Sequence, residues 1–143
     1  MRKRLFVMMI LICLLALFIG CQQEERTPTE PGILSVGEDT NQIIVSKMKG
    51  SEEIVFEDRE SIDALQEILV SAIKEEGIVD MAEAEYIIDF YQDEEKQQSL
   101  FMWIGEEGEG KGTFMKPEDT HTIYSVSVDV NSTLIELVES RFE

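Results

Sequence analysis

The sequence offers a single histidine and many carboxylates as candidates for acid–base chemistry. His121 follows Glu118 and Asp119, and a carboxylate beside an imidazole can orient a general base. Pairs such as Asp80 with Glu83 could supply the two acids of a glycoside hydrolase. With 30 acidic residues in the chain, however, such pairs arise by chance. These residues give no convincing catalytic set, so we expect no catalytic residue.

The glycine-rich stretch at residues 105–112 matches only part of a phosphate-binding loop. Its sequence, GEEGEGKG, satisfies GxxxxGK but places Gly112 where Ser or Thr would hold magnesium. Its three glutamates would repel phosphate, and its spacing is not that of an EF-hand calcium loop. We therefore expect no nucleotide, cofactor or specific metal site here, and leave open whether the glutamates attract calcium.

Aromatic side chains in the second half of the chain give a candidate binding face. The strand predicted around Phe101 is apolar on both sides, so one side should pack under helices while the other stays partly exposed. An exposed aromatic face suits an envelope protein, a peptide or a glycan; the alternative is that these side chains only fill the core. The candidate face comprises Tyr86, Tyr91, Phe101, Trp103 and Tyr124.

The N-terminus carries the marks of a secretory signal peptide. Three basic residues precede an apolar run at residues 5–19. At about 1.5 Å per residue this run reaches roughly 22 Å, which is short of a ~30 Å hydrocarbon core. An uncleaved membrane anchor is the alternative interpretation.

The end of this segment, Leu17-Phe18-Ile19-Gly20-Cys21, resembles the lipobox of bacterial lipoproteins, with Phe18 where Leu is usual. The resemblance implies cleavage between Gly20 and Cys21 and a diacylglycerol lipid on the Cys21 thiol. We expect a signal peptide at residues 1–20, a lipidated cysteine and polar tether at 21–41, and one extracytoplasmic domain at 42–143. The protein would then lie on the outer face of the cytoplasmic membrane.

The charge of the chain excludes several partners. Loss of three basic residues with the leader would leave 30 acidic and 9 basic residues, which changes the formal net charge from −18 to −21. Such a domain repels nucleic acid and anionic lipid headgroups. Cys13 would leave with the leader and Cys21 would carry the lipid, so the mature domain would have no disulfide and no cysteine-based metal site.

The hydrophobic pattern predicts the elements that position these residues. Alternation predicts strands near residues 43–48, 53–57, 86–91, 99–104, 113–115 and 122–128. Helical spacing predicts a helix that is capped by Asp58 or Ser61 and ends at Gly77, with Ala72 and Ile73 on its inner face. It also predicts a last helix capped by Asn131 or Ser132. The order ββα-ββββ-α with short links predicts an α+β fold, in which two helices cover one face of an antiparallel sheet of about five to six strands.

Several segments resemble the YhfM-like small lipoproteins of spore-forming Gram-positive bacteria. They are residues 76–81 leading to Tyr86, and residues 100–104, 112–115 and 122–124. The resemblance covers residues 43–142 and the lipidated start. It implies a cell-surface lipoprotein domain of unknown function and supplies no catalytic or binding residue.

Together these features predict a membrane-anchored, non-catalytic binding module that faces the cell wall. The alternative is a small envelope-acting enzyme or enzyme inhibitor that uses surface carboxylates and His121.

The lipobox generates a direct prediction. Replacement Cys21→Ala removes the thiol that would carry the lipid, so the precursor should stay unlipidated and uncut at this site. Metabolic labelling with a radioactive fatty acid, followed by electrophoresis, measures both effects. Labelling as strong in the variant as in the wild type would contradict the assignment.

Overall fold

The computed structural model describes residues 34–77 and 80–142, so the predicted leader and Cys21 lie outside the described residues. Within these ranges the chain forms a seven-stranded antiparallel sheet, two α-helices and a 3₁₀ turn. The strands are β1 (Gln42–Lys47), β2 (Glu53–Phe56), β3 (Ile73–Lys74), β4 (Tyr86–Gln92), β5 (Glu95–Trp103), β6 (Thr113–Lys116) and β7 (Asp119–Ser125). The helices are α2 (Arg59–Val70), α3 (Val128–Val138) and the 3₁₀ turn η1 (Glu139–Arg141).

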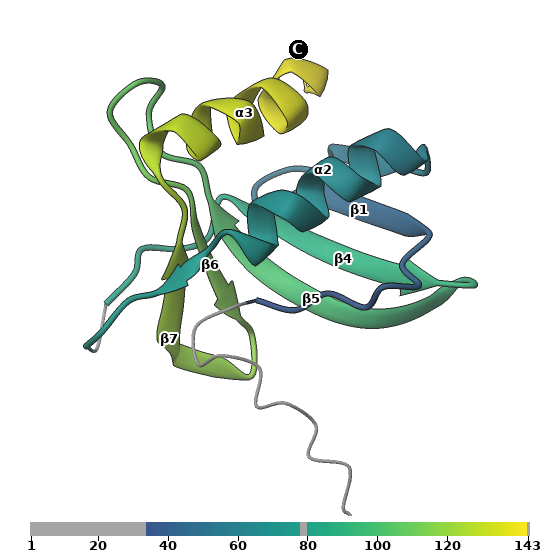
Figure 1. Ribbon diagram of the computed structural model, residues 1–143, viewed down its shortest axis with the longest axis horizontal. Helices are drawn as coiled ribbons and strands as arrows, with labels where there is room; N and C mark the ends of the chain where they lie inside the picture. Colours follow the sequence, from purple (N-terminus) through teal and green to yellow (C-terminus); the bar gives the residue numbers. More distant parts are fainter. Residues whose placement is uncertain (1–33, 78–79, 143) are drawn as a thin grey trace, which may run out of the picture.

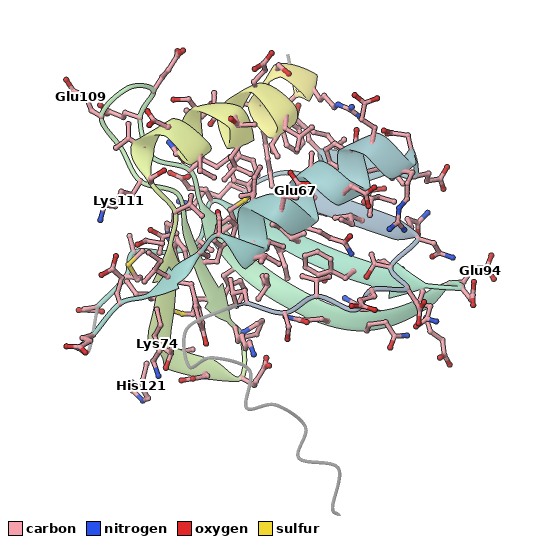
Figure 2. The ribbon with its side chains drawn as sticks, in the orientation of Figure 1. Glu67, Lys74, Glu94, Glu109, Lys111 and His121 are labelled. Atoms are coloured by element: carbon pink, nitrogen blue, oxygen red, sulfur yellow. The ribbon has the colours of Figure 1, made fainter. Side chains whose placement is uncertain are left out.

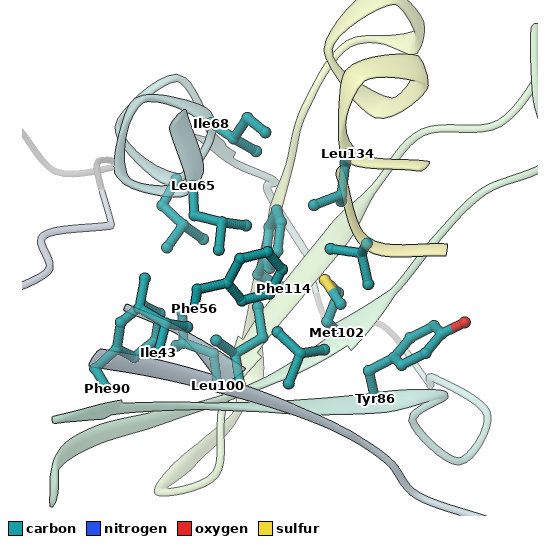
Figure 3. Packing of buried hydrophobic residues seen from close by; sticks show 14 of the residues in the cluster. Ile43, Phe56, Leu65, Ile68, Tyr86, Phe90, Leu100, Met102, Phe114 and Leu134 are labelled. Atoms are coloured by element: carbon teal, nitrogen blue, oxygen red, sulfur yellow. The ribbon is translucent and has the colours of Figure 1, made fainter. Parts of the chain in front are cut away.

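Both α-helices lie on the same face of the sheet, whose strand order is β2-β1-β4-β5-β6-β7-β3 (Figure 1). Alternate strand residues point toward the helices and form the core between the two layers (Figure 3). The predicted α+β class is therefore confirmed. The largest fully buried side chains include Phe56, Phe90, Phe114, Leu65, Leu100, Met102 and Leu134.

Helix α2 begins where predicted but ends earlier. The Asp58 side chain accepts a hydrogen bond of 2.8 Å from the backbone N–H of Ser61, as an N-cap should. At the other end, the Ser71 hydroxyl donates to the carbonyl of Ile68 at 2.6 Å, and the helix stops at Val70. Ile73, expected on the inner face of the helix, is instead 70% exposed.

The predicted strand count was too low because of the short strand β3. It pairs with the end of β7, opposite Ser125 and Tyr124. The backbone groups of Ile73 and Lys74 pair with β7 at this edge of the sheet. This pairing is more favourable than continuing the helix through these two residues. The order is thus ββα-βββββ-α, with β3 inserted before the four strands that were predicted.

Helix α3 begins four residues before the predicted caps. The Ser127 hydroxyl accepts from the backbone N–H of Val130 at 3.3 Å, and the preceding strand ends at Ser125. Asn131 is fully buried and donates from Nδ2 to the carbonyl of Gly105 at 2.9 Å. It therefore joins α3 to the glycine-rich loop and does not cap the helix.

Both ends of the described domain are packed. Leu34 is fully buried in the core, upstream of the expected boundary at residue 42. At the other end, the guanidinium of Arg141 lies 4.6 Å from the ring centre of Phe56, while the ring of Phe142 stacks on Tyr86 at 5.6 Å. In the described ranges, neither helix has the length and hydrophobicity needed to cross a bilayer.

The core makes a stability prediction. Phe114→Ala should lower the free energy of unfolding by about 3–5 kcal/mol, because it removes a fully buried ring and leaves a cavity. The measurement is urea unfolding followed by circular dichroism. Val70→Ala is the control, since Val70 is 53% exposed and should change stability by less than about 0.5 kcal/mol. Equal losses in the two variants would contradict the assignment of this core.

Candidate functional site

The face of the sheet without helices, here called the open face, carries a row of apolar side chains. Ile87 of β4 lies opposite Phe101 of β5, which lies opposite Met115 of β6, which lies opposite Ile123 of β7. We call these four residues the apolar row. They are separate from the core cluster under the helices. Ile87 and Phe101 remain half-buried, so part of the row is accessible.

A crossover segment at residues 80–85 leads from the edge strand β3 to β4 and borders the open face. The indole Nε1–H of Trp103 donates to the carbonyls of Ala82 and Glu83, each at 3.1 Å. The N–H of Glu85 donates to the carbonyl of Met102, and its carboxylate accepts from the N–H of Ile104 at 2.8 Å. These bonds fix the segment beside β5.

The crossover encloses a hollow of about 540 Å³ on the open face. Trp103 and Phe101 line it from the sheet, and His121 lies at its edge. We call this the Trp103 hollow. The other apolar side chains on its wall are Met48, Met81, Ala82, Ala84 and Met115.

A second hollow of about 570 Å³ lies on the other side of Phe101 and includes Ile87, Ser99 and Glu118. Two of its polar side chains, Lys96 and Ser99, contact Asp89, whose side chain is only 15% exposed. One carboxylate oxygen of Asp89 accepts from the Ser99 hydroxyl at 2.5 Å, and the other lies 3.1 Å from the Lys96 ammonium.

The Asp89 hydrogen bond raises the pKa of Lys96 above its ordinary value. Lys96 is therefore protonated at neutral pH and cannot act as a general base. The Lys96 ammonium neutralises the partly buried Asp89 carboxylate and does not activate the Ser99 hydroxyl.

The five aromatic residues predicted as one face lie on both sides of the sheet. Strand alternation places Phe101, Trp103 and Tyr91 on the open face, with Tyr91 at the opposite end of β4 from the Trp103 hollow. Tyr86 belongs to the core cluster, and Tyr124 packs against that cluster. Burial and the nearby Glu139 carboxylate raise the pKa of the Tyr86 phenol. Only Phe101 and Trp103 therefore meet at one site.

His121 projects from β7 at the end far from α3 (Figure 2) and is exposed. Its neighbour Asp119 does not orient the imidazole: the carboxylate interacts with the Thr122 side chain and accepts from the backbone N–H of His121 at 3.3 Å. The Thr122 hydrogen bond, followed by that N–H, lowers the pKa of Asp119. This arrangement differs from that of a general base, in which the carboxylate hydrogen-bonds to the imidazole ring.

The glycine-rich loop at residues 105–112 is tightly folded. A side chain on Gly105 would meet the backbone of Gly110 at 2.6 Å, and one on Gly112 would meet Asn131 and Val126 at 2.9 Å. Gly105 and Gly110 therefore allow close backbone packing, and Gly112 leaves room for the side chains of α3 and Val126. In the described part of the chain, no group of three His, Cys, Asp or Glu side chains is placed to hold a metal ion.

Sequence reasoning missed the methionines of the site. Met115 could have been found from its neighbour: Phe114 points into the core, so Met115 must point to the open face. Met48 ends the strand predicted at residues 43–48, although the structure places it just after β1. Met81 lies in a connection, where no periodicity assigns a face. Their arrival at Trp103 depends on the path of the crossover.

Comparison with known proteins identifies the family and the fold. The model of the family described as YhfM protein matches residues 37–143. A crystal structure of a thioesterase-like protein from Clostridium sporogenes is 19% identical, with a TM-score of 0.52 over 71% of this chain and 95% of that chain. At this identity the likeness concerns the fold alone. The search of curated proteins gave no match.

The bonds between Trp103 and the crossover generate a prediction. Trp103→Phe keeps an aromatic ring on the open face but removes the indole N–H, so the crossover should detach more often. We expect faster hydrogen exchange at the amides of Glu85 and Ile104, and a loss of about 1 kcal/mol in unfolding free energy. Amide exchange followed by NMR measures the first effect.

Tyr91→Phe is the control for this variant, because Tyr91 lies on the same face but does not line the Trp103 hollow. It should leave both amides unchanged. If Trp103→Phe also leaves them unchanged, the indole does not fix the crossover.

Proposed function

The chain belongs to the YhfM protein family, and from that premise we propose that it is a membrane-anchored, extracytoplasmic binding module whose open face receives a partner. The observation that carries the proposal is the accessible part of the apolar row beside the Trp103 hollow. A hollow with apolar walls and a few polar groups at its edge is the usual form of a binding site. The lipobox-like segment ending at Cys21 supplies the anchor.

The negative charge of the domain favours a partner in the envelope and disfavours the lipid surface as its ligand. After loss of the leader, the formal net charge of −21 opposes contact with anionic headgroups. A lipid on Cys21 followed by a polar tether would keep the domain close to the membrane while leaving the open face accessible.

Position-specific photocrosslinking tests the proposal in intact cells. A benzophenone amino acid at Met48, which is 38% exposed and lines the Trp103 hollow, should give a discrete crosslinked adduct of higher mass on a gel. The same amino acid at Val70, at the end of α2, is the control and should give none. Both positions carry exposed apolar residues, so incorporation there should not disturb the core.

Two results would contradict the proposal. Adducts of equal yield at the two positions would show that the open face is not selective. No adduct at Met48 in correctly lipidated protein would show that no partner occupies this face under the conditions of growth.

A further inference from the structure

The Trp103 hollow is suited to an apolar side chain. Three of its wall residues, Met48, Met81 and Met115, are methionines, whose flexible thioethers adapt to the shape of a bound group. The polar atom of Trp103 already donates to the crossover carbonyls. The indole therefore contributes an apolar surface with no unmet hydrogen bond.

The charges around the two hollows are predominantly negative. Asp80 and Glu83 belong to the Trp103 hollow, and Glu118 belongs to the hollow across Phe101. Two ammonium groups lie close by, and both are already paired. Lys96, which also lines the second hollow, lies 3.1 Å from Asp89, and Lys49 lies 3.2 Å from Glu83. In the described ranges, neither Asp80 nor Glu118 has a cationic group within 4 Å.

The two hollows meet at Phe101, which contributes to both. They therefore form a strip that is longer than one side chain. In an extended peptide, alternate side chains point the same way and lie about 7 Å apart, so two of them can occupy the hollows on either side of one ring.

We propose that this strip binds an extended cationic peptide segment of a partner protein. Its apolar side chains enter the hollows beside Phe101, and its Lys or Arg side chains face Asp80 and Glu118. The charge complementarity selects this occupant over a second copy of the mature chain, which carries the same net charge of −21. The inference rests on the proposed function and specifies the chemistry of the partner.

The only tryptophan of the chain provides the measurement, because Trp103 lies in the hollow. The purified protein is titrated with the synthetic peptide acetyl-KKLSLKK-amide, in which both Leu side chains and the two terminal Lys side chains lie on one face of an extended strand, while tryptophan emission is recorded. We expect a saturable change in emission. The matched peptides acetyl-EELSLEE-amide and acetyl-KKSSSKK-amide should each give no saturable change, since one reverses the charge and the other removes the apolar side chains.

Variants separate the two parts of the recognition. Met81→Lys places a charge in the hollow and should abolish the saturable change, whereas Val55→Lys makes the same kind of substitution outside both hollows and should not. Asp80→Asn with Glu118→Gln should weaken binding about fivefold and reduce its salt dependence, as expected for two exposed charge pairs. Circular dichroism confirms that each variant is folded.

Equal binding of the Lys and Glu peptides would overturn the cationic partner, and equal effects of Met81→Lys and Val55→Lys would overturn the hollow as its site. Binding of none of the peptides would also overturn the inference. A photocrosslinked partner at Met48 together with no peptide binding would leave the proposed function standing, so the two failures are distinguishable.

Discussion

Strand β5 carries apolar side chains on both of its faces, and the rest of the structure depends on how each face is covered. Leu100 and Met102 point toward the helices, while Phe101 and Trp103 point away from them. Helices α2 and α3 both pack on the first face. Among the described residues, the crossover at 80–85 partly covers the second face and leaves the two hollows beside Phe101. The core and the candidate site are thus opposite sides of one strand.

The C-terminal residues close the helix side of this arrangement. Arg141 places its guanidinium over Phe56 and donates to the Ser61 hydroxyl at 3.1 Å, so it connects η1 to β2 and α2. Phe142 stacks on Tyr86, and the Lys47 ammonium lies 4.6 Å from the Phe142 ring centre. Tyr86 therefore packs on the helix side of the sheet and does not contribute to the open face.

The sequence predicts the elements that depend on local pattern. Alternation located β1, β2 and β4 within one or two residues, and helical spacing with Asp58 located the start of α2. Strand β3 could not be predicted, because Ile73 and Lys74 form a strand only through pairing with β7. The grouping of five aromatic residues failed for a related reason: side-chain alternation, with a period of two, separates Phe101 from Tyr86 and Tyr124 across the sheet. The Trp103 hollow could not be predicted either, because it depends on the connection between β3 and β4. The course of this connection is set by the order of the strands in the sheet.

The separation of the two faces has an evolutionary consequence. Met48 and Met81 lie outside the core cluster, in a turn and in the crossover, so substitutions there alter the hollow without creating cavities under the helices. Mutations at such positions have small stability costs compared with those in the core. Members that share this fold can therefore change the shape of this hollow by drift in the crossover while keeping the same scaffold.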